Sequence, residues 1–124
     1  MGVFKFRTSR IDTVIGMSVR LQQKKNQNVL PGILPATIIT LSPRGACLIF
    51  PKLLVNGQHL FFDTLDSDVF NLMLCTEGES GEAVGGSIAA QSVWMDSCEY
   101  KGCPAFKVGV QFLVEQKTFF NLFK

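Results

Sequence analysis

Basic side chains that could bind an anion are concentrated in the first half of the chain. Residues 1–52 carry eight Lys and Arg but a single acid, Asp12, for a net charge of +7, whereas residues 53–100 carry eight acids and no Lys or Arg. Arg7 and Arg10 lie close together near the amino terminus, where an anionic ligand would meet positive charge. The alternative is that basic and acidic strands lie side by side and neutralise each other across a sheet.

Residue patterns typical of catalysis or metal binding are scarce. There is no Gly-x-Ser-x-Gly elbow, Walker loop or Gly-x-Gly-x-x-Gly stretch, and the single histidine, His59, has no motif around it. Only Cys98 and Cys103 are close in sequence, and no Cys/His set has zinc-site spacing. Residues 63–68 lack the glycine and terminal glutamate of a calcium loop, and the glycine-rich segment 78–86 carries acids that would repel phosphate. We therefore expect no enzyme activity, no metal and no cofactor.

Length and composition indicate one domain. The chain has 124 residues, 47% of them hydrophobic, which suits a single globular core. Its longest apolar runs are far shorter than the roughly 20 residues of a membrane-spanning helix. The first residues lack the apolar core and cleavage site of a signal peptide. We expect a cytoplasmic protein with no membrane span and with reduced thiols at all four cysteines.

Short strands separated by turn residues account for most of the chain. A late apolar segment, 115–124, is predicted to form a helix that closes one end of the fold with Phe119, Phe120 and Phe123. Trp94 is expected to point into the core, because it lies in a strand of alternating residues. Such strand spacing predicts an antiparallel barrel or sandwich. The predicted strands cover residues 14–22, 33–41, 46–50, 59–63, 69–75, 87–95 and 106–114.

Four short stretches in a fixed order resemble the PilZ domain family. They are Arg7-Thr-Ser-Arg10, Thr40-Leu-Ser-Pro-Arg-Gly45, Ser92-Val-Trp-Met95 and Lys107-Val-Gly-Val-Gln-Phe-Leu113. PilZ domains have an Arg-x-x-x-Arg stretch, an Asp/Asn-x-Ser-x-x-Gly stretch opening a strand, a Val-x-Trp-like strand and a Val-Gly-Val-x-Phe strand. The resemblance implies a six-stranded antiparallel β-barrel with a short carboxy-terminal helix. The single domain would then divide into a flexible arm (1–12), a barrel (13–114) and a helix (115–124).

PilZ domains are typically receptors for the bacterial second messenger cyclic di-GMP, which offers two phosphates and two guanines. The resemblance implies that Arg7 and Arg10 hold phosphate and guanine, because a guanidinium forks onto either group. Thr40, Ser42 and Gly45 would form the turn that recognises the base, and Arg44 would add positive charge. The implied protein is an effector or adaptor that changes conformation on binding the ligand. It would signal to an unidentified bacterial protein partner in motility, adhesion or biofilm control; no DNA or RNA partner is expected, and a homodimer is left open.

Two positions depart from the family pattern. Two residues separate Arg7 from Arg10 instead of three, and Phe6 stands where the first arginine would be. Thr40 replaces the usual Asp or Asn and cannot bridge both hydrogen-bond donors of guanine. Losing a charge-assisted hydrogen bond costs about 1.5 to 3 kcal/mol. The alternative function is therefore a degenerate PilZ domain that does not bind cyclic di-GMP and acts only as a protein-interaction module.

Overall fold

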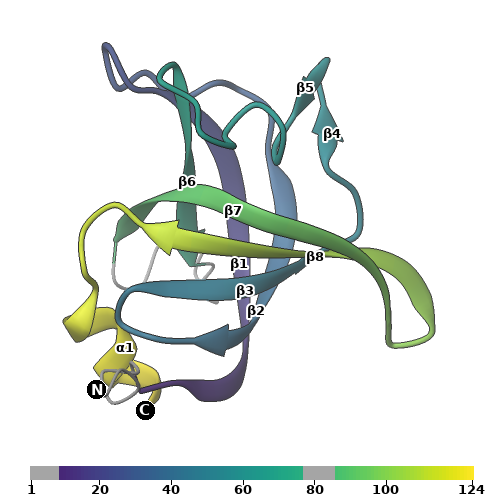
Figure 1. Ribbon diagram of the computed structural model, residues 1–124, viewed down its shortest axis with the longest axis vertical. Helices are drawn as coiled ribbons and strands as arrows, with labels where there is room; N and C mark the ends of the chain where they lie inside the picture. The colour runs from purple at the N-terminus through teal and green to yellow at the C-terminus, as the bar shows by residue number, and fades with distance from the viewer. Residues whose placement is uncertain (1–8, 77–85) are drawn as a thin grey trace, which may run out of the picture.

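Eight β-strands and one short helix make up the regular structure of the described residues (Figure 1). The computed structural model describes residues 9–76 and 86–124. The elements are β1 (Ile11–Gln23), β2 (Leu34–Leu41), β3 (Gly45–Phe50), β4 (Leu54–Val55), β5 (Gln58–His59), β6 (Phe70–Thr76), β7 (Ser87–Tyr100), β8 (Cys103–Phe112) and α1 (Lys117–Phe123).

Six of the strands form one antiparallel sheet in the order β1-β2-β3-β8-β7-β6. Strand β1 pairs with β2 on one side and with β6 on the other, so the sheet closes on itself as a barrel. Strands β4 and β5 form a separate hairpin beside it, at the upper right of Figure 1. Asn56 and Gly57, with φ of 51° and 78°, make the tight turn of this hairpin, as their sequence predicts.

Alternate residues of the six strands fill the barrel. On β1, for example, Met17, Val19 and Leu21 are buried, while the residues between them are more exposed. Helix α1 lies at one end of the barrel, at the lower left of Figure 1, and buries Phe119 and Phe120 in the same apolar core. Burial of these rings explains why so short a helix is stable, since seven residues do not hold a helix in water alone.

The expected all-β fold, with its six-stranded antiparallel sheet and short carboxy-terminal helix, is confirmed, but several boundaries differ. Ile11 and Asp12 belong to β1 rather than to an arm. The predicted strand over residues 59–63 is wrong beyond His59. The Asp63 amide donates to the His59 carbonyl at 2.9 Å and the Asp63 carboxylate accepts from the His59 amide, so the chain turns back there.

The third difference lies between β7 and β8. The predicted strands 87–95 and 106–114 leave ten residues between them, but both strands extend further, and Lys101 and Gly102, both with positive φ, form a two-residue turn that joins them directly. The resulting hairpin is long and projects to the right in Figure 1. No helix among the described residues is long and apolar enough to cross a bilayer.

The described strands have three register irregularities: one on β1 between Asp12 and Ile15, and two β-bulges, on β2 and β7, that change which residues face outward beside the groove described below. On β2, Ile38 pairs with Leu48 and Thr40 with Cys47, so Ile39 is the extra, unpaired residue of a bulge. On β7, Ser92 pairs with Val110 and Trp94 with Gly109, which makes Val93 the extra residue. A bulge reverses the inward and outward alternation of the strand beyond it.

The bulge on β7 corrects the expectation for Trp94. Ser92 is buried, and strict alternation would bury Trp94 as well. Because Val93 is inserted between them, the Trp94 ring is turned outward and is 43% exposed. The prediction that Trp94 packs into the core is therefore wrong.

Candidate ligand-binding groove

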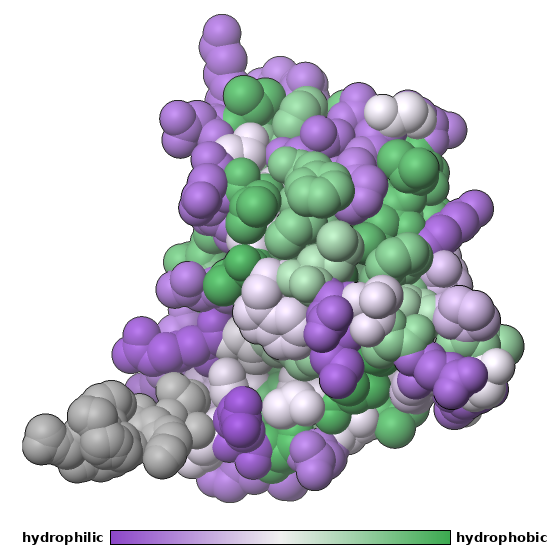
Figure 2. All heavy atoms as spheres, turned by 45° about the vertical axis from the view of Figure 1, so that its right-hand side comes forward, coloured by the Kyte–Doolittle hydropathy of each residue, from purple (hydrophilic) through white to green (hydrophobic). Residues whose placement is uncertain are grey.

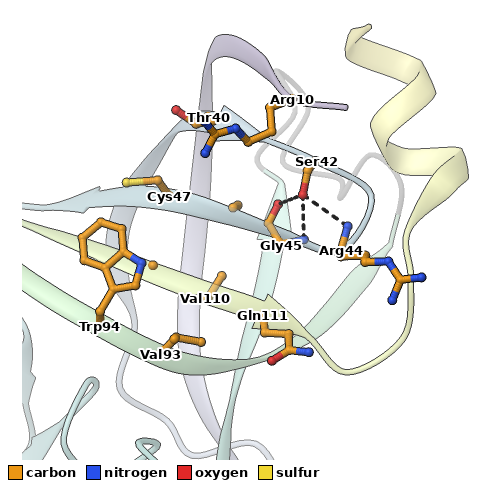
Figure 3. A pocket seen from close by; sticks show the side chains of 12 residues that line it. Arg10, Thr40, Ser42, Arg44, Gly45, Cys47, Val93, Trp94, Val110 and Gln111 are labelled. Carbon is orange, nitrogen blue, oxygen red and sulfur yellow. Dashed lines mark hydrogen bonds between the residues drawn. The ribbon is translucent and has the colours of Figure 1, made fainter. Parts of the chain in front are cut away.

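An open groove of about 440 Å³ lies on the outer surface of the barrel (Figure 3). Strands β2, β3, β8 and β7 contribute to it, together with the turn between β2 and β3. Its size lies within the range of about 300 to 1,000 Å³ that small-molecule sites occupy. The groove is lined by Arg10, Thr40, Ser42, Arg44, Gly45, Ala46, Cys47, Val93, Trp94, Gly109, Val110 and Gln111.

Five of the six residues selected from the sequence lie along this groove: Arg10, Thr40, Ser42, Arg44 and Gly45. In Figure 3 the Arg10 side chain extends toward Thr40, whereas the Arg44 guanidinium points away from the groove toward solvent. The sixth residue, Arg7, lies outside the described residues. The fold therefore brings Arg10 to a turn that is more than thirty residues further along the chain.

Ser42 holds the turn between β2 and β3 in shape. Its hydroxyl donates to the Gly45 carbonyl at 3.2 Å and accepts from the amides of Arg44 and Gly45 at 3.3 and 3.1 Å (Figure 3). The Ser42 amide also donates to the Gly45 carbonyl at 2.9 Å. A serine hydroxyl has one hydrogen to donate and two lone pairs. All three are used here, so Ser42 positions the turn instead of offering its hydroxyl to a ligand.

The same turn is tied to two other elements. The Phe112 amide at the end of β8 donates to the Arg44 carbonyl at 2.8 Å. The Gln116 amide, just before α1, donates to the Pro43 carbonyl at 2.6 Å. Each carbonyl from Pro43 to Gly45 thus already accepts a hydrogen bond within the protein. The turn is a rigid edge of the groove and is directly connected to the carboxy-terminal helix.

Two glycines keep the groove free of side chains. A Cβ atom at Gly45 would overlap the backbone carbonyl oxygen of Val110, and one at Gly109 would overlap the Trp94 ring. The Trp94 indole therefore lies close against the backbone of β8, an approach that only glycine allows. Its opposite face is turned toward solvent, as the 43% exposure indicates. The groove thus has an aromatic surface at one side and the Ser42–Gly45 turn at the other.

The charge along the groove is positive. Arg10 and Arg44 contribute cations, and no Asp or Glu is among the described residues that line it. Neutralisation of basic strands by acidic ones is limited, because Asp96 and Lys107 are the only residues of opposite charge that pair across strands in ranges 9–76 and 86–124. The two arginines form no ion pair with another described residue, so they are available to an anionic ligand.

Cys47 adds a thiol to the groove. Burial raises the pKa of this thiol, nearby Lys107 opposes the shift, and Cys98 adds to it. A raised pKa keeps the thiol protonated at neutral pH and makes it a poor nucleophile. No cluster of three or more His, Cys, Asp or Glu that could hold a metal is present in the part of the chain that the structure describes.

Sequence reasoning missed the groove residues on β7 and β8. Trp94 and Gly109 lie in two of the stretches that suggested the family, but they were interpreted as features of strands. A bulge leaves no reliable trace in the hydrophobic pattern, so the outward turn of Trp94 could not be foreseen. The glycine that follows Val108 in the Val-Gly-Val stretch was the available signal, because an outward glycine in a strand often marks a close approach by another group.

The fold and the groove together define a closed antiparallel barrel with a cationic, partly aromatic binding surface on its outside. No protein-family model, no curated protein and no solved structure matches the chain.

Proposed function

We propose that the chain is a PilZ-like domain that binds cyclic di-GMP in the groove and signals its occupancy to a bacterial protein partner in the cytoplasm. The observation that carries the proposal is that Arg10 and residues of the Thr40–Gly45 stretch, selected from the sequence as ligand-binding motifs, line one groove whose described residues include no acid. The order of the six strands, closed by pairing of β1 with β6, is compatible with the PilZ-like barrel that the resemblance implies.

The groove chemistry suits this ligand. Cyclic di-GMP carries two phosphates, and Arg10 can donate two parallel hydrogen bonds to one of them. Arg44 adds positive charge at the same edge, although its side chain points away from the groove. The exposed indole of Trp94 offers an apolar surface to a planar base. Ser42 and Gly45 contribute by fixing the turn, and Arg7 is assigned to the ligand by motif alone.

The connection between the turn and helix α1 supports a signalling role. A ligand that moves the Ser42–Gly45 turn would strain the hydrogen bond from the Gln116 amide to the Pro43 carbonyl. Because Gln116 directly precedes α1, the strain would reach the helix and alter the end of the barrel that it covers. Binding can shift such an equilibrium only if the ligand prefers one position of the turn.

The alternative is a degenerate PilZ domain that acts only by contacting another protein. Thr40 favours it, because threonine lacks the second oxygen with which Asp would accept both guanine donors. This alternative predicts no measurable affinity for cyclic di-GMP.

Isothermal titration calorimetry with cyclic di-GMP decides between the two. We expect Arg10→Ala to weaken binding by about 2 kcal/mol, roughly thirtyfold, because it removes a charge-assisted and often bidentate contact. Arg20→Ala is the matched control, because it makes the same charge change on β1 away from the groove. Thr40→Asp should tighten binding by supplying a second acceptor oxygen.

Two results would count against the receptor. The absence of heat at high micromolar ligand, with no rescue by Thr40→Asp, would favour the degenerate interaction module. Equal weakening by the Arg10 and Arg20 substitutions would mean that the ligand responds only to diffuse positive charge.

A further inference from the structure

We infer that the groove does not select guanine over adenine and binds cyclic purine dinucleotides as a class, with one base stacked on Trp94. The inference rests on the proposed function and makes it more specific, since it concerns which ligands of that kind the same groove accepts. It follows from an exposed aromatic ring and from a threonine, Thr40, at the position where a carboxylate would recognise guanine.

Trp94 provides a stacking surface that is indifferent to the identity of the base. The bulge at Val93 turns its ring outward, and Gly109 lets one face of the indole lie against β8. The ring is 43% exposed and lines the groove. A base stacks on an aromatic ring through its own π face, which every purine has, so stacking contributes affinity without reading hydrogen-bonding edges.

Recognition of guanine requires acceptors for its N1 and N2 hydrogens, and each carbonyl from Pro43 to Gly45 already accepts at least one hydrogen bond within the protein. The carbonyl of Pro43 accepts from the Gln116 amide and that of Arg44 from the Phe112 amide. The Gly45 carbonyl accepts from both the amide and the hydroxyl of Ser42. The Ser42 hydroxyl is itself saturated by its contacts within the turn.

The polar side chains that remain can serve either purine. Thr40 carries a hydroxyl that donates or accepts, and Gln111 carries an amide with both a donor and an acceptor end. Guanine presents an acceptor at O6 with donors beside it, and adenine presents the reverse arrangement at N6 and N1. A rotatable hydroxyl and an amide that can turn over match both patterns. Among the described lining residues none carries a carboxylate, the group that would favour guanine alone.

The test compares cyclic di-GMP with cyclic di-AMP on the intact chain. Trp94 is the single tryptophan, so its emission reports directly on this ring. We expect both ligands to quench Trp94 emission, to shield it from acrylamide, and to bind with dissociation constants within about tenfold of each other, since stacking on one ring serves either base. Calorimetry provides the affinities independently of the fluorescence.

Substitution of Trp94 tests the stacking surface. Trp94→Ala should weaken both ligands by about tenfold or more and by similar factors, whereas Trp94→Phe, which keeps an aromatic face, should retain most of the affinity. Tyr100→Ala is the matched control, because it removes an aromatic ring from the same strand outside the groove and should leave both affinities unchanged. Circular dichroism verifies that each variant is folded.

Thr40→Asp tests the missing acceptor. A carboxylate accepts from the guanine donors but opposes the N1 lone pair of adenine, so this variant should prefer cyclic di-GMP at least tenfold more than the wild type does. If this one substitution makes the groove selective, the wild-type groove already binds purine dinucleotides and lacks only the acceptor that recognises guanine.

The outcomes separate the inference from the proposed function. If wild type binds cyclic di-GMP through Arg10 but binds cyclic di-AMP a hundredfold more weakly, the inference that the groove accepts either purine is wrong. The proposed function as a cyclic di-GMP receptor is then still supported. If Trp94→Ala leaves both affinities and the titration heats unchanged, the stacking surface is wrong while the receptor again stands. If neither ligand binds the folded wild-type chain at millimolar concentration, both the inference and the proposed function fail.

Discussion

Gly45 and Gly109 determine the shape of the groove by carrying no side chain, and Gly45 can be tested by a single methyl group. We expect Gly45→Ala to lower the free energy of unfolding by about 1 to 3 kcal/mol, because the new Cβ would overlap the backbone oxygen of Val110 and force β3 away from β8. Urea denaturation measures the change.

Gly16→Ala is the control, because nothing lies within 4 Å of a Cβ built at Gly16 in the middle of β1. That substitution should be neutral or stabilise the fold by about 0.4 to 1 kcal/mol. If Gly45→Ala and Gly16→Ala change the free energy of unfolding equally, the backbone accommodates a Cβ atom at Gly45 without a loss of stability, and the prediction is wrong.

The thiol of Cys47 gives a second prediction at the scale of a residue. Burial raises the pKa of Cys47, so less of it is thiolate at a given pH and it should react slowly with iodoacetamide near pH 8. Cys103 is exposed at the start of β8 and should react first. Mass spectrometry of timed samples gives the order of modification.

Ligand in the groove should slow Cys47 further and leave Cys103 unaffected, since only Cys47 lines the groove. Modification of Cys47 before Cys103 would contradict the burial described for this thiol.

At the scale of an element, helix α1 is expected to stabilise the barrel through two rings. Phe119→Ala should cost about 3 to 5 kcal/mol, because a buried Phe loses its transfer free energy and leaves a cavity. Leu122→Ala is the control on the same helix, since Leu122 is 55% exposed and should change stability by less than about 0.5 kcal/mol. Thermal denaturation followed by circular dichroism compares the two. Similar melting temperatures for both variants would mean that α1 does not stabilise the core.

The elements also show how far the sequence leads. The six long strands were predictable because apolar residues alternate along them and turn residues separate them. The structure of the segment after His59 was not predictable. Leu60 and Phe62 alternate with their neighbours as in a strand, but the Asp63 carboxylate accepts from the His59 amide and closes a turn. The bulges on β2 and β7 were not predicted for a related reason. A bulge depends on which residues pair across the sheet, and these residues are distant in sequence.

The candidate site was predictable in the same uneven way. Arg10 and Ser42–Gly45 were found because their types and order match a known pattern. The role of Ser42 could not be predicted. Its hydroxyl makes all its hydrogen bonds within the turn, and these bonds depend on the local backbone geometry. Trp94 was assigned to the core because hydrophobicity alone cannot distinguish a buried ring from one that lines a groove.

For the whole molecule, closure of the sheet predicts the pattern of amide exchange. Residues 17–19 of β1 pair with β2 and with β6, so their amides exchange only when the barrel opens. Residues 97–100 of β7 pair with β8 alone among the described strands. We therefore expect hydrogen exchange to be slowest in β1 and much faster at the β7–β8 tip.

Exchange measured at two protein concentrations provides the control for this prediction. Strong protection of residues 97–104 at high concentration alone would indicate that a second copy covers the free edge of β7. Protection equal to that of β1 even in dilute solution would contradict the prediction.

Apolar side chains also remain exposed near the hairpin formed by β4 and β5. Leu54 and Phe62 are 61% and 60% exposed, and Figure 2 shows apolar areas in the corresponding upper half of that face, interspersed with hydrophilic ones. The candidate groove is therefore not the most apolar surface of the molecule. The groove is distinguished by its cations, its aromatic ring and the absence of acids among the described residues that line it.

The extra residue at Val93 makes β7 tolerant of the loss of one codon. Without Val93, Trp94 would directly follow Ser92, so simple alternation would still place Trp94 on the solvent side and Met95 on the barrel side, paired with Gly109 and Val108 as before. Loss of this codon would therefore spare both the groove and the interior, whereas loss of one codon from a regular strand would exchange its two faces beyond that point. Over evolutionary time, the length of β7 should accordingly vary at Val93 before it varies elsewhere.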